Sequence, residues 1–211
     1  RIVTGDTKVV RRGQGDKVYI NTAGIGRSIA RPKLRKIRPG DKVILTGTLG
    51  DHSLAVMLAR GDFGLSSNVR SDCAPLLFLL PLWKKGALWM RDVTRGGLAT
   101  LLFELAERLR YPLLIEEAMI PLSKPVLAAS ELLGIDPLYM ACEGKATIIA
   151  PQAKAGEFLR LIRNHPLGRK AAIIGEVQDR VGRPGELLLQ TATGGLRLLE
   201  PLTSELLPRI C

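Results

Sequence analysis

Short apolar runs typical of β-strands alternate with longer segments of helical periodicity between residues 41 and 203. The strand-like runs include VILTG, ALWMRDV, PLLIEE, KATIIA, AAIIGEVQ, ELLLQT and GLRLLE. One helical segment, GGLATLLFELAERLR, places five leucines on one face of a 3.6-residue period: Leu98, Leu101, Leu102, Leu105 and Leu109. This alternation predicts an α/β (α+β) sandwich built around a mixed sheet.

The first 40 residues have a different pattern. The runs IVTGDTKVV and KVYINTAGIG predict two strands joined by the turn RRGQGD. A basic connection, RPKLRKIRPGDK, then ends in a Pro-Gly turn, which places a boundary near residue 40. No capping or leader residues precede the first strand, so we expect that a segment lies upstream of it.

The cysteines and the apolar runs bear on the compartment. Cys73, Cys142 and Cys211 lie far apart without CxxC spacing, which favours neither a zinc site nor a disulfide framework. No run of 18 apolar residues and no signal-peptide pattern is present. We therefore expect a cytoplasmic chain that does not enter a membrane.

The chain has a formal net charge of +11, and its basic residues are densest in one patch. This basic linker contains Arg31, Lys33, Arg35, Lys36, Arg38 and Lys42. It is a natural nucleic-acid footprint, but only 4% of residues are aromatic and no nucleic-acid-binding motif accompanies it. A solvated linker or a surface for an acidic partner protein is the favoured interpretation, and we expect no nucleic-acid partner.

Three glycine turns follow predicted strands: TGDTK (4 to 8), TGTLGD (46 to 51) and DVTRGG (92 to 97). Amides in such turns bind phosphate, and a helix starting at Gly96 or Gly97 adds its positive dipole end. Taken singly, each turn is weak evidence for phosphate binding, because glycine is also the default residue in an ordinary strand-to-helix connection. Asp92 has the chemistry of a magnesium–nucleotide ligand, or alternatively of an N-cap for the following helix. Asp51 is a plausible N-cap of the helix DHSLAVMLARG.

Three further residues have reactive side chains. Glu143, in the turn ACEGK, is a candidate general base or, alternatively, a turn acid paired with Lys145. Lys8, two residues after Asp6, is a candidate for stabilising a transferring phosphate or a plain surface lysine. Cys211 ends the chain after Pro208, so it is either a chance terminal thiol or a reactive group on a mobile tail.

Taken in order, the motifs resemble a known family. They are TGDTKVV, INTAGIG, RPGD, GDHS, SDCAPL, RDVTRGG, EGK, HPLGR, AAIIGEV and the terminal PRIC. Together they resemble the HypE family of hydrogenase maturation proteins over essentially the whole chain. That family is similar in fold to aminoimidazole ribonucleotide synthetase, selenophosphate synthetase and thiamine-monophosphate kinase.

The resemblance implies an activity. It implies that Cys211 receives a carbamoyl group from the carbamoyltransferase HypF. ATP-dependent dehydration of this carboxamide then leaves a thiocyanate, whose cyanide passes to iron on the HypC–HypD complex for [NiFe]-hydrogenase. The implied cofactors are ATP and Mg²⁺.

The implied roles fall on residues already singled out. Glu143 is the base, Lys8 stabilises charge or orients the amide, and Asp92 holds Mg²⁺ and the nucleotide. Asp6, Thr94 and Gly96 complete the expected nucleotide site. Cys142 departs from the family, in which an asparagine is common before the glutamate.

The resemblance also implies a domain division. Residues 1–40 are expected to be a remnant of an amino-terminal ATP-binding and dimerisation domain, an incomplete half-barrel. Residues 41–203 form the carboxy-terminal α/β domain, and residues 204–211 form a mobile tail. We expect a homodimer in the complete protein and weak ATP binding by this chain alone. The alternatives are a noncatalytic module that presents its tail to maturation partners, and a basic nucleic-acid-binding protein.

Overall fold

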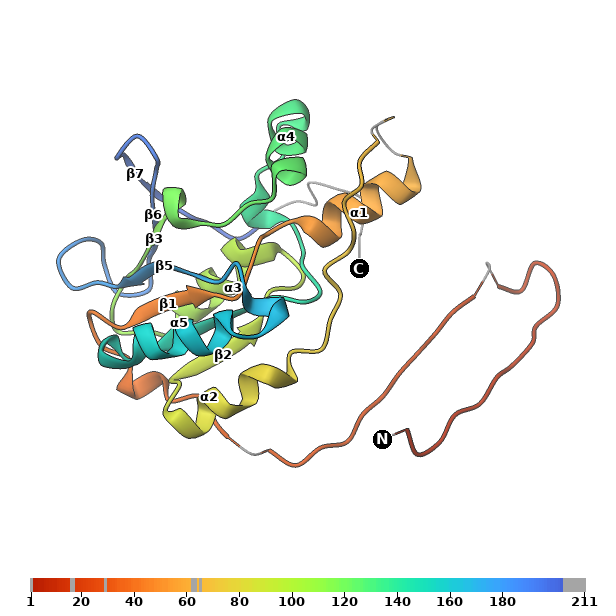
Figure 1. Ribbon diagram of the computed structural model, residues 1–211, viewed down its shortest axis with the longest axis horizontal. Coiled ribbons are helices and arrows are strands. Elements are labelled where there is room, and N and C mark those ends of the chain that lie inside the picture. The colour runs from red at the N-terminus through yellow and green to blue at the C-terminus, as the bar shows by residue number, and fades with distance from the viewer. Residues whose placement is uncertain (1, 16–17, 29, 62–63, 65, 203–211) are drawn as a thin grey trace.

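The computed structural model describes residues 2–15, 18–28, 30–61, 64 and 66–202. The chain divides into an extended arm, residues 2–28, and a folded body that begins near residue 30 (Figure 1). The arm joins the body near residue 30, and the domain boundary near residue 40 stays a prediction.

A seven-stranded sheet forms the centre of the body. Its strands are β1 (Lys42–Leu45), β2 (Trp89–Asp92), β3 (Leu113–Glu116), β4 (Ala146–Ala150), β5 (Ala172–Val177), β6 (Leu187–Gln190) and β7 (Leu196–Leu198). The spatial order is β2-β4-β1-β5-β3-β6-β7, with β3 and β6 parallel and the other neighbours antiparallel. The mixed sheet predicted from the sequence is confirmed.

Among the described residues, five α-helices are interspersed with short 3-10 turns. The helices are α1 (Asp51–Arg60), α2 (Leu80–Lys85), α3 (Gly97–Ala106), α4 (Lys124–Leu133) and α5 (Ala155–Arg163). The 3-10 turns are η1 (Leu34–Lys36), η2 (Leu77–Leu79), η3 (Glu117–Met119), η4 (Pro137–Tyr139), η5 (Gln152–Lys154) and η6 (Pro166–Gly168). Pro81 lies in the first turn of α2, just after η2, where its missing N–H costs no intrahelical bond.

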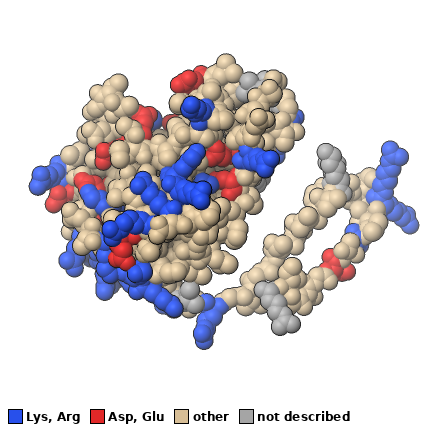
Figure 2. All heavy atoms as spheres, in the orientation of Figure 1, with Lys and Arg blue, Asp and Glu red and all other residues tan. Residues whose placement is uncertain are grey.

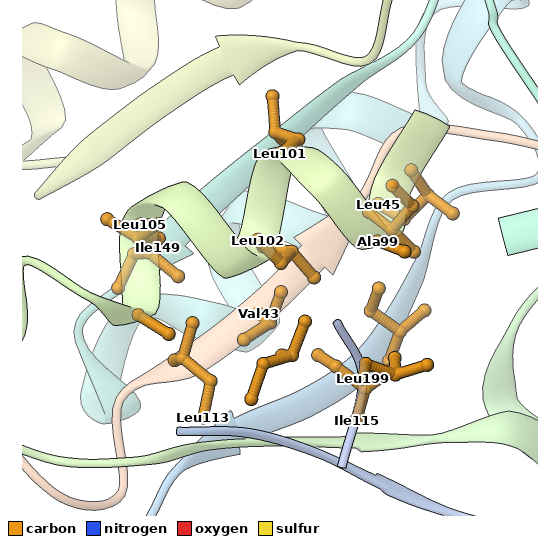
Figure 3. Packing of buried hydrophobic residues seen from close by; sticks show 14 of the residues in the cluster. Val43, Leu45, Ala99, Leu101, Leu102, Leu105, Leu113, Ile115, Ile149 and Leu199 are labelled. Atoms are coloured by element: carbon orange, nitrogen blue, oxygen red, sulfur yellow. The ribbon is translucent and has the colours of Figure 1, made fainter. Parts of the chain in front are cut away.

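Helix α3 covers one face of the sheet. The five leucines predicted to share a face are all buried, at exposures of 7% or less. They pack with Val43, Leu45 and Ile149 of the sheet (Figure 3). Ile44, between the two inward residues of β1, points to the opposite face and packs with Ile148 and with Phe158 of α5. The period-2 alternation of β1 therefore joins two cores.

Helices α1 and α4 form a third, smaller core. Leu54 and Met57 of α1 pack with Val126 and Ala129 of α4, and Met140 completes the cluster. Helix α1 begins at Asp51, but Gly50 occupies the N-cap position, in a left-handed conformation. The predicted N-cap role of Asp51 is therefore wrong, because the left-handed backbone that turns the chain into the helix favours glycine.

The arm carries no strand in its described residues, so the two strands predicted there are not confirmed. The expected turn is present, with Gln14 N donating to Arg11 O at 3.0 Å. Apolar side chains along the arm are exposed, for example Ile2 at 92% and Ile20 at 83%. The described residues offer these segments no partner strand or apolar surface, and an isolated two-stranded hairpin is at best marginally stable in water.

None of the helices that the structure describes combines the length and the apolar character needed to span a membrane.

Candidate functional site

Three turns meet at one end of the sheet, and we call them the turn cluster: residues 46–51, 92–97 and 142–145. Antiparallel pairing of β2 with β4 sets Asp92 opposite Ala146. Beyond the strands, Val93 N donates to Lys145 O at 2.9 Å and Cys142 N donates to Val93 O at 3.1 Å. Thr46 N donates to Ala146 O at 3.0 Å. The pairing of three strands therefore brings together turns that are distant in sequence.

The turn at residues 92–97 joins β2 to α3. Asp92 is exposed at the end of β2, and Thr94 is half-buried. Gly96 is the N-cap of α3, with φ 75°, so the alternative role of Asp92 as that N-cap is excluded. Gly97 follows with φ 65°, and a Cβ there would lie 2.4 Å from Leu138 O. The helix start therefore packs directly on a neighbouring backbone, and α3 begins five residues after Asp92 in the chain.

The turn that contains Glu143 is held by a segment far away in the sequence. Glu143 N donates to Asp72 Oδ1 at 2.9 Å, and Ala74 N donates to Glu143 O at 3.3 Å. Lys145 Nζ lies 3.0 Å from Asp72 Oδ2 in a buried ion pair. One interpretation of the sequence was that Glu143 is a turn acid paired with Lys145. In the structure, the ion-pair partner of Lys145 is Asp72.

Cys142 is fully buried immediately before Glu143. Gly50 N donates to its sulfur at 3.4 Å. Burial, reinforced by the carboxylate of Asp72, raises the pKa of the Cys142 thiol to about 12, against the opposing effect of the Gly50 amide. The thiol therefore stays protonated at neutral pH and is a packing group beside the candidate base.

Asp51, in the third turn, has its carboxylate committed to local hydrogen bonds. Ser123 Oγ donates to Asp51 Oδ1 at 2.7 Å, and Thr48 Oγ1 donates to Asp51 Oδ2. Next to it, His52 Nδ1 lies 2.9 Å from Ser71 Oγ. These bonds connect the start of α1 to the 71–74 segment and to the loop before α4.

Asp6 and Lys8 lie on the exposed arm, and the structure does not bring them into the turn cluster (Figure 1). Asp6 Oδ1 accepts from Thr7 N at 2.8 Å, a local contact within the arm. The body brings together four of the predicted site residues, Asp92, Thr94, Gly96 and Glu143.

The last described residues run past the start of α3. Leu199 N donates to Leu187 O at 2.9 Å, and Tyr139 Oη donates to Glu200 O at 2.9 Å. Leu202 N reaches Thr100 Oγ1 at 3.5 Å, in the first turn of α3. Cys211 lies outside the described residues, nine positions beyond Leu202. Nine residues span at most about 30 Å.

The fit to magnesium and a nucleotide is partial. The described residues contain no group of three or more His, Cys, Asp or Glu side chains able to hold a metal ion. Mg²⁺ is usually held by one or two carboxylates together with phosphate oxygens and water. The exposed carboxylate of Asp92, beside the amides at the start of α3, matches one such ligand.

A separate hollow of about 600 Å³ lies between the basic linker and α2. Its lining consists of Ala30, Arg31, Lys33, Leu77, Leu80, Pro81, Trp83 and Lys84, none of which belongs to the turn cluster. Lys and Arg gather over η1, α2 and α5 in this part of the molecule (Figure 2). Lys33 N donates to Leu88 O at 2.7 Å, so the linker is attached to the body.

Sequence reasoning missed Asp72 and Lys145 as partners at the site. They are separated by 72 intervening residues and share no local motif. Asp72 belongs to the SDCAPL motif, which is visible in the sequence. Nothing in the spacing of that motif indicates that Asp72 contacts the turn that contains Glu143. Thr100 and Tyr139, which hold the last described residues, were missed for the same reason.

The sequence of this chain is similar to those of known proteins. Residues 38–184 match the model of the family described as AIR synthase related protein, C-terminal domain. The chain is 42% identical over 219 residues to the carbamoyl dehydratase HypE of Rhodobacter capsulatus, covering 100% of this chain and 63% of that protein. It is 40% identical over 214 residues to the Escherichia coli protein of the same name, covering 62% of it.

Solved structures agree. A hydrogenase maturation protein HypE in complex with ATP superposes with a TM-score of 0.77 at 38% identity, covering 85% of this chain and 55% of that one. A HypE–HypF complex gives 0.72 at 34% identity, with coverage of 80% and 55%. Thiamine monophosphate kinase from Aquifex aeolicus, at 20% identity and a TM-score of 0.54, shares the fold. The chain spans 62 to 63% of the length of the two curated relatives cited above.

Proposed function

Because this chain belongs to the family of AIR synthase related proteins and is similar to HypE carbamoyl dehydratases along its whole length, we propose that it serves [NiFe]-hydrogenase maturation. The proposed reaction is ATP-dependent dehydration of a carboxamide carried on the sulfur of Cys211. The product is a thiocyanate, which supplies the cyanide ligand of the iron.

One observation carries this proposal most strongly: the Glu143 turn and the Asp92–Gly97 turn adjoin, and the chain leading to Cys211 starts beside them. Val93 is hydrogen-bonded to both Cys142 and Lys145, which flank the Glu143 turn. Leu202 contacts Thr100 in the first turn of α3. A tether of at most about 30 Å from that point is long enough for Cys211 to reach the turn cluster.

The chemistry requires a good leaving group at oxygen and a base at nitrogen. ATP supplies the phosphoryl group that converts the carboxamide oxygen into part of a phosphate leaving group. The C–O bond then breaks, the oxygen departs with phosphate, and the nitrogen loses both protons as the C≡N bond forms. The products are the S-cyanated cysteine, ADP, phosphate and a proton.

We assign Glu143 as the base that accepts a proton from the amide nitrogen. Its half-buried position beside Cys142, which stays neutral, favours a defined carboxylate position. Asp92 is assigned to Mg²⁺, and Thr94, Gly96 and the amides at the start of α3 are assigned to nucleotide phosphate.

The two arm residues keep the roles that the resemblance implies. Lys8 is proposed to stabilise the developing negative charge or to orient the amide, and Asp6 is proposed as a companion in the nucleotide site. Both assignments require the arm to approach the turn cluster, because the structure holds these residues on the exposed arm.

The proposed partners are HypF, which would load the carbamoyl group, and a HypC–HypD complex, which would accept the cyanide. The similarity to the HypE structure solved in complex with HypF supports the first of these. A homodimer, and a cytoplasm that keeps the Cys211 thiol reduced, are also part of the proposal.

Mass spectrometry of Cys211 tests the proposal in the protein at its full natural length. After incubation with the carbamoyl donor system and ATP, we expect the carbamoylated terminal peptide to lose the mass of one water. Glu143→Gln is expected to accumulate the carbamoylated peptide without this loss. Glu104→Gln, on the exposed outer face of α3, is the control and is expected to behave as the wild type.

A second candidate is a noncatalytic module that presents its tail to maturation partners. The position of Asp6 and Lys8 on the exposed arm favours it, because the described body then holds only part of the expected site. Carbamoylation of Cys211 without any ATP-dependent loss of water in the wild type would support this module and overturn the dehydratase.

A further inference from the structure

We propose that Asp72 is a positioning residue that fixes the backbone of the Glu143 turn and so aims the Glu143 carboxylate at its substrate. The inference rests on the proposed role of Glu143 as the base. Asp72 belongs to the segment between α1 and η2, which contains no other residue assigned to the reaction.

Both oxygens of the Asp72 carboxylate face the turn. Oδ1 accepts from Glu143 N at 2.9 Å, and Oδ2 lies 3.0 Å from Lys145 Nζ. The contact with Lys145 is ionic rather than a directed hydrogen bond, because Oδ2 has no partner with hydrogen-bond geometry among the described residues. One side chain thus holds the residues on either side of Gly144.

The two backbones are also pressed together. A Cβ on Gly144 would lie 1.8 Å from Asp72 O, so only glycine fits there. Ala74 N donates to Glu143 O at 3.3 Å, which adds a second hydrogen bond between the segments. The carbonyl and the amide of Glu143 are therefore both bound to the 72–74 segment, and rotation of its peptide groups would break one or the other.

The burial of this ion pair indicates that it has a specific purpose. The Asp72 and Lys145 side chains are 5% and 10% exposed. Removing two charges from water is costly, and well-packed apolar residues often serve stability equally well. What an apolar pair cannot supply is an acceptor for the Glu143 amide. Since proton transfer demands reach within about 3 Å, a displaced turn weakens the base without removing it.

Paired double variants separate this role from stability. Asp72→Leu with Lys145→Met removes the pair and the acceptor, whereas Asp72→Asn with Lys145→Met removes the charges but keeps an acceptor for Glu143 N. Two measurements follow: hydrogen exchange of the Glu143 amide in this chain, and dehydration kinetics in the protein at its full natural length.

We expect the leucine variant to lose protection at the Glu143 amide and to lower kcat by roughly 100-fold, with little change in KM for ATP. The asparagine variant is expected to keep protection and to remain within about tenfold of the wild-type kcat. Unchanged protection in the folded leucine variant, or equal kcat in the two folded variants, would overturn the proposal.

Failure to fold and failure of the proposed function give different results. If the leucine variant does not fold, the single Asp72→Asn change still tests the acceptor, because it must preserve Glu143 protection. A wild type that never dehydrates its tail counts against the proposed function, while the exchange measurement still decides whether Asp72 orders the turn.

Discussion

At the scale of single residues, burial makes the two cysteines that the structure describes chemically different. Cys73 is exposed and Cys142 is fully buried. Burial and the nearby Asp72 carboxylate raise the pKa of the Cys142 thiol to about 12, from an ordinary value of 9.0. The folded chain therefore holds this proton at a pH where the unfolded chain has released it.

This difference predicts a loss of stability in alkali. As the pH rises from about 9 to about 12, the unfolded thiol ionises first, so unfolding releases a proton and becomes easier. Relative to Cys142→Ala, the wild-type free energy of unfolding should fall by up to about 1.4 kcal/mol per pH unit in this range. Urea unfolding of both proteins at a series of pH values measures it.

The comparison with the alanine variant isolates the effect of this thiol, because the two proteins differ only at residue 142. Parallel pH profiles for the two proteins would show that the Cys142 pKa is close to its ordinary value.

The sequence predicts the type of these residues better than their contacts. It identified Glu143 as a turn acid and Asp92 as a carboxylate at a strand end, because Glu143 lies in a glycine turn just before a recognisable strand and Asp92 ends another. It did not identify Asp72, whose role depends on a contact with a turn 71 positions later. Contacts of that kind arise from strand order, which local patterns do not contain.

At the scale of elements, the start of α3 depends on two consecutive left-handed glycines. Gly96 has φ 75° and Gly97 has φ 65°, and the second also packs on the η4 backbone. This geometry turns the chain sharply from β2 into the helix and brings Thr100 to the last described residues.

Two glycine substitutions should have opposite effects. Gly97→Ala combines a strained φ with a contact of 2.4 Å to Leu138 O, and we expect it to destabilise the fold by about 2 kcal/mol or more. Gly156→Ala, in α5 with no atom within 4 Å of the new Cβ, should stabilise by about 0.5–1 kcal/mol. Urea unfolding of the two variants gives both values.

The Gly156 variant is also the control for helix propensity in the first substitution. If Gly97→Ala were as stable as the wild type, that result would contradict the close contact between the start of α3 and the backbone of η4.

Elements with strong periodicity were predictable. The leucine stripe of α3 and the alternation in β1 show which side chains must be buried, and the spacing of those side chains identifies the first element as a helix and the second as a strand. The arm strands were not confirmed, because the same alternation is uninformative when no surface is available to bury it. A β-strand forms only when a second segment pairs with it, and the sequence of one segment does not contain that partner.

At the scale of the whole molecule, the body and the arm divide the expected site between them. Asp92 and Glu143 belong to the body, whereas Asp6 and Lys8 lie on the arm. Residues 2–15 and 18–28 are exposed throughout, so the arm contributes no buried surface in its described part.

We therefore expect this chain alone to bind Mg-ATP with a Kd weaker than about 1 mM, a free energy of roughly −4 kcal/mol. The reason is that Asp92 and the amides of α3 would bind the nucleotide without help from Asp6 and Lys8, which lie on the exposed arm. Titration calorimetry in the presence of Mg²⁺ measures the affinity. Tight Mg²⁺-dependent binding that Asp92→Asn abolishes would show that the body holds a complete nucleotide site.

The contacts of Glu200 and Leu202 with Tyr139 and Thr100 have a kinetic consequence. Under the proposed function, a Cys211 thiol nine residues beyond Leu202 would be presented to the turn cluster at an effective concentration on the order of millimolar. Dilution would then slow the proposed encounters with HypF and with a HypC–HypD complex but not the encounter of Cys211 with Glu143. Under the proposed function the carboxamide is part of the catalyst, so the dehydration step would saturate with ATP but not with the carboxamide.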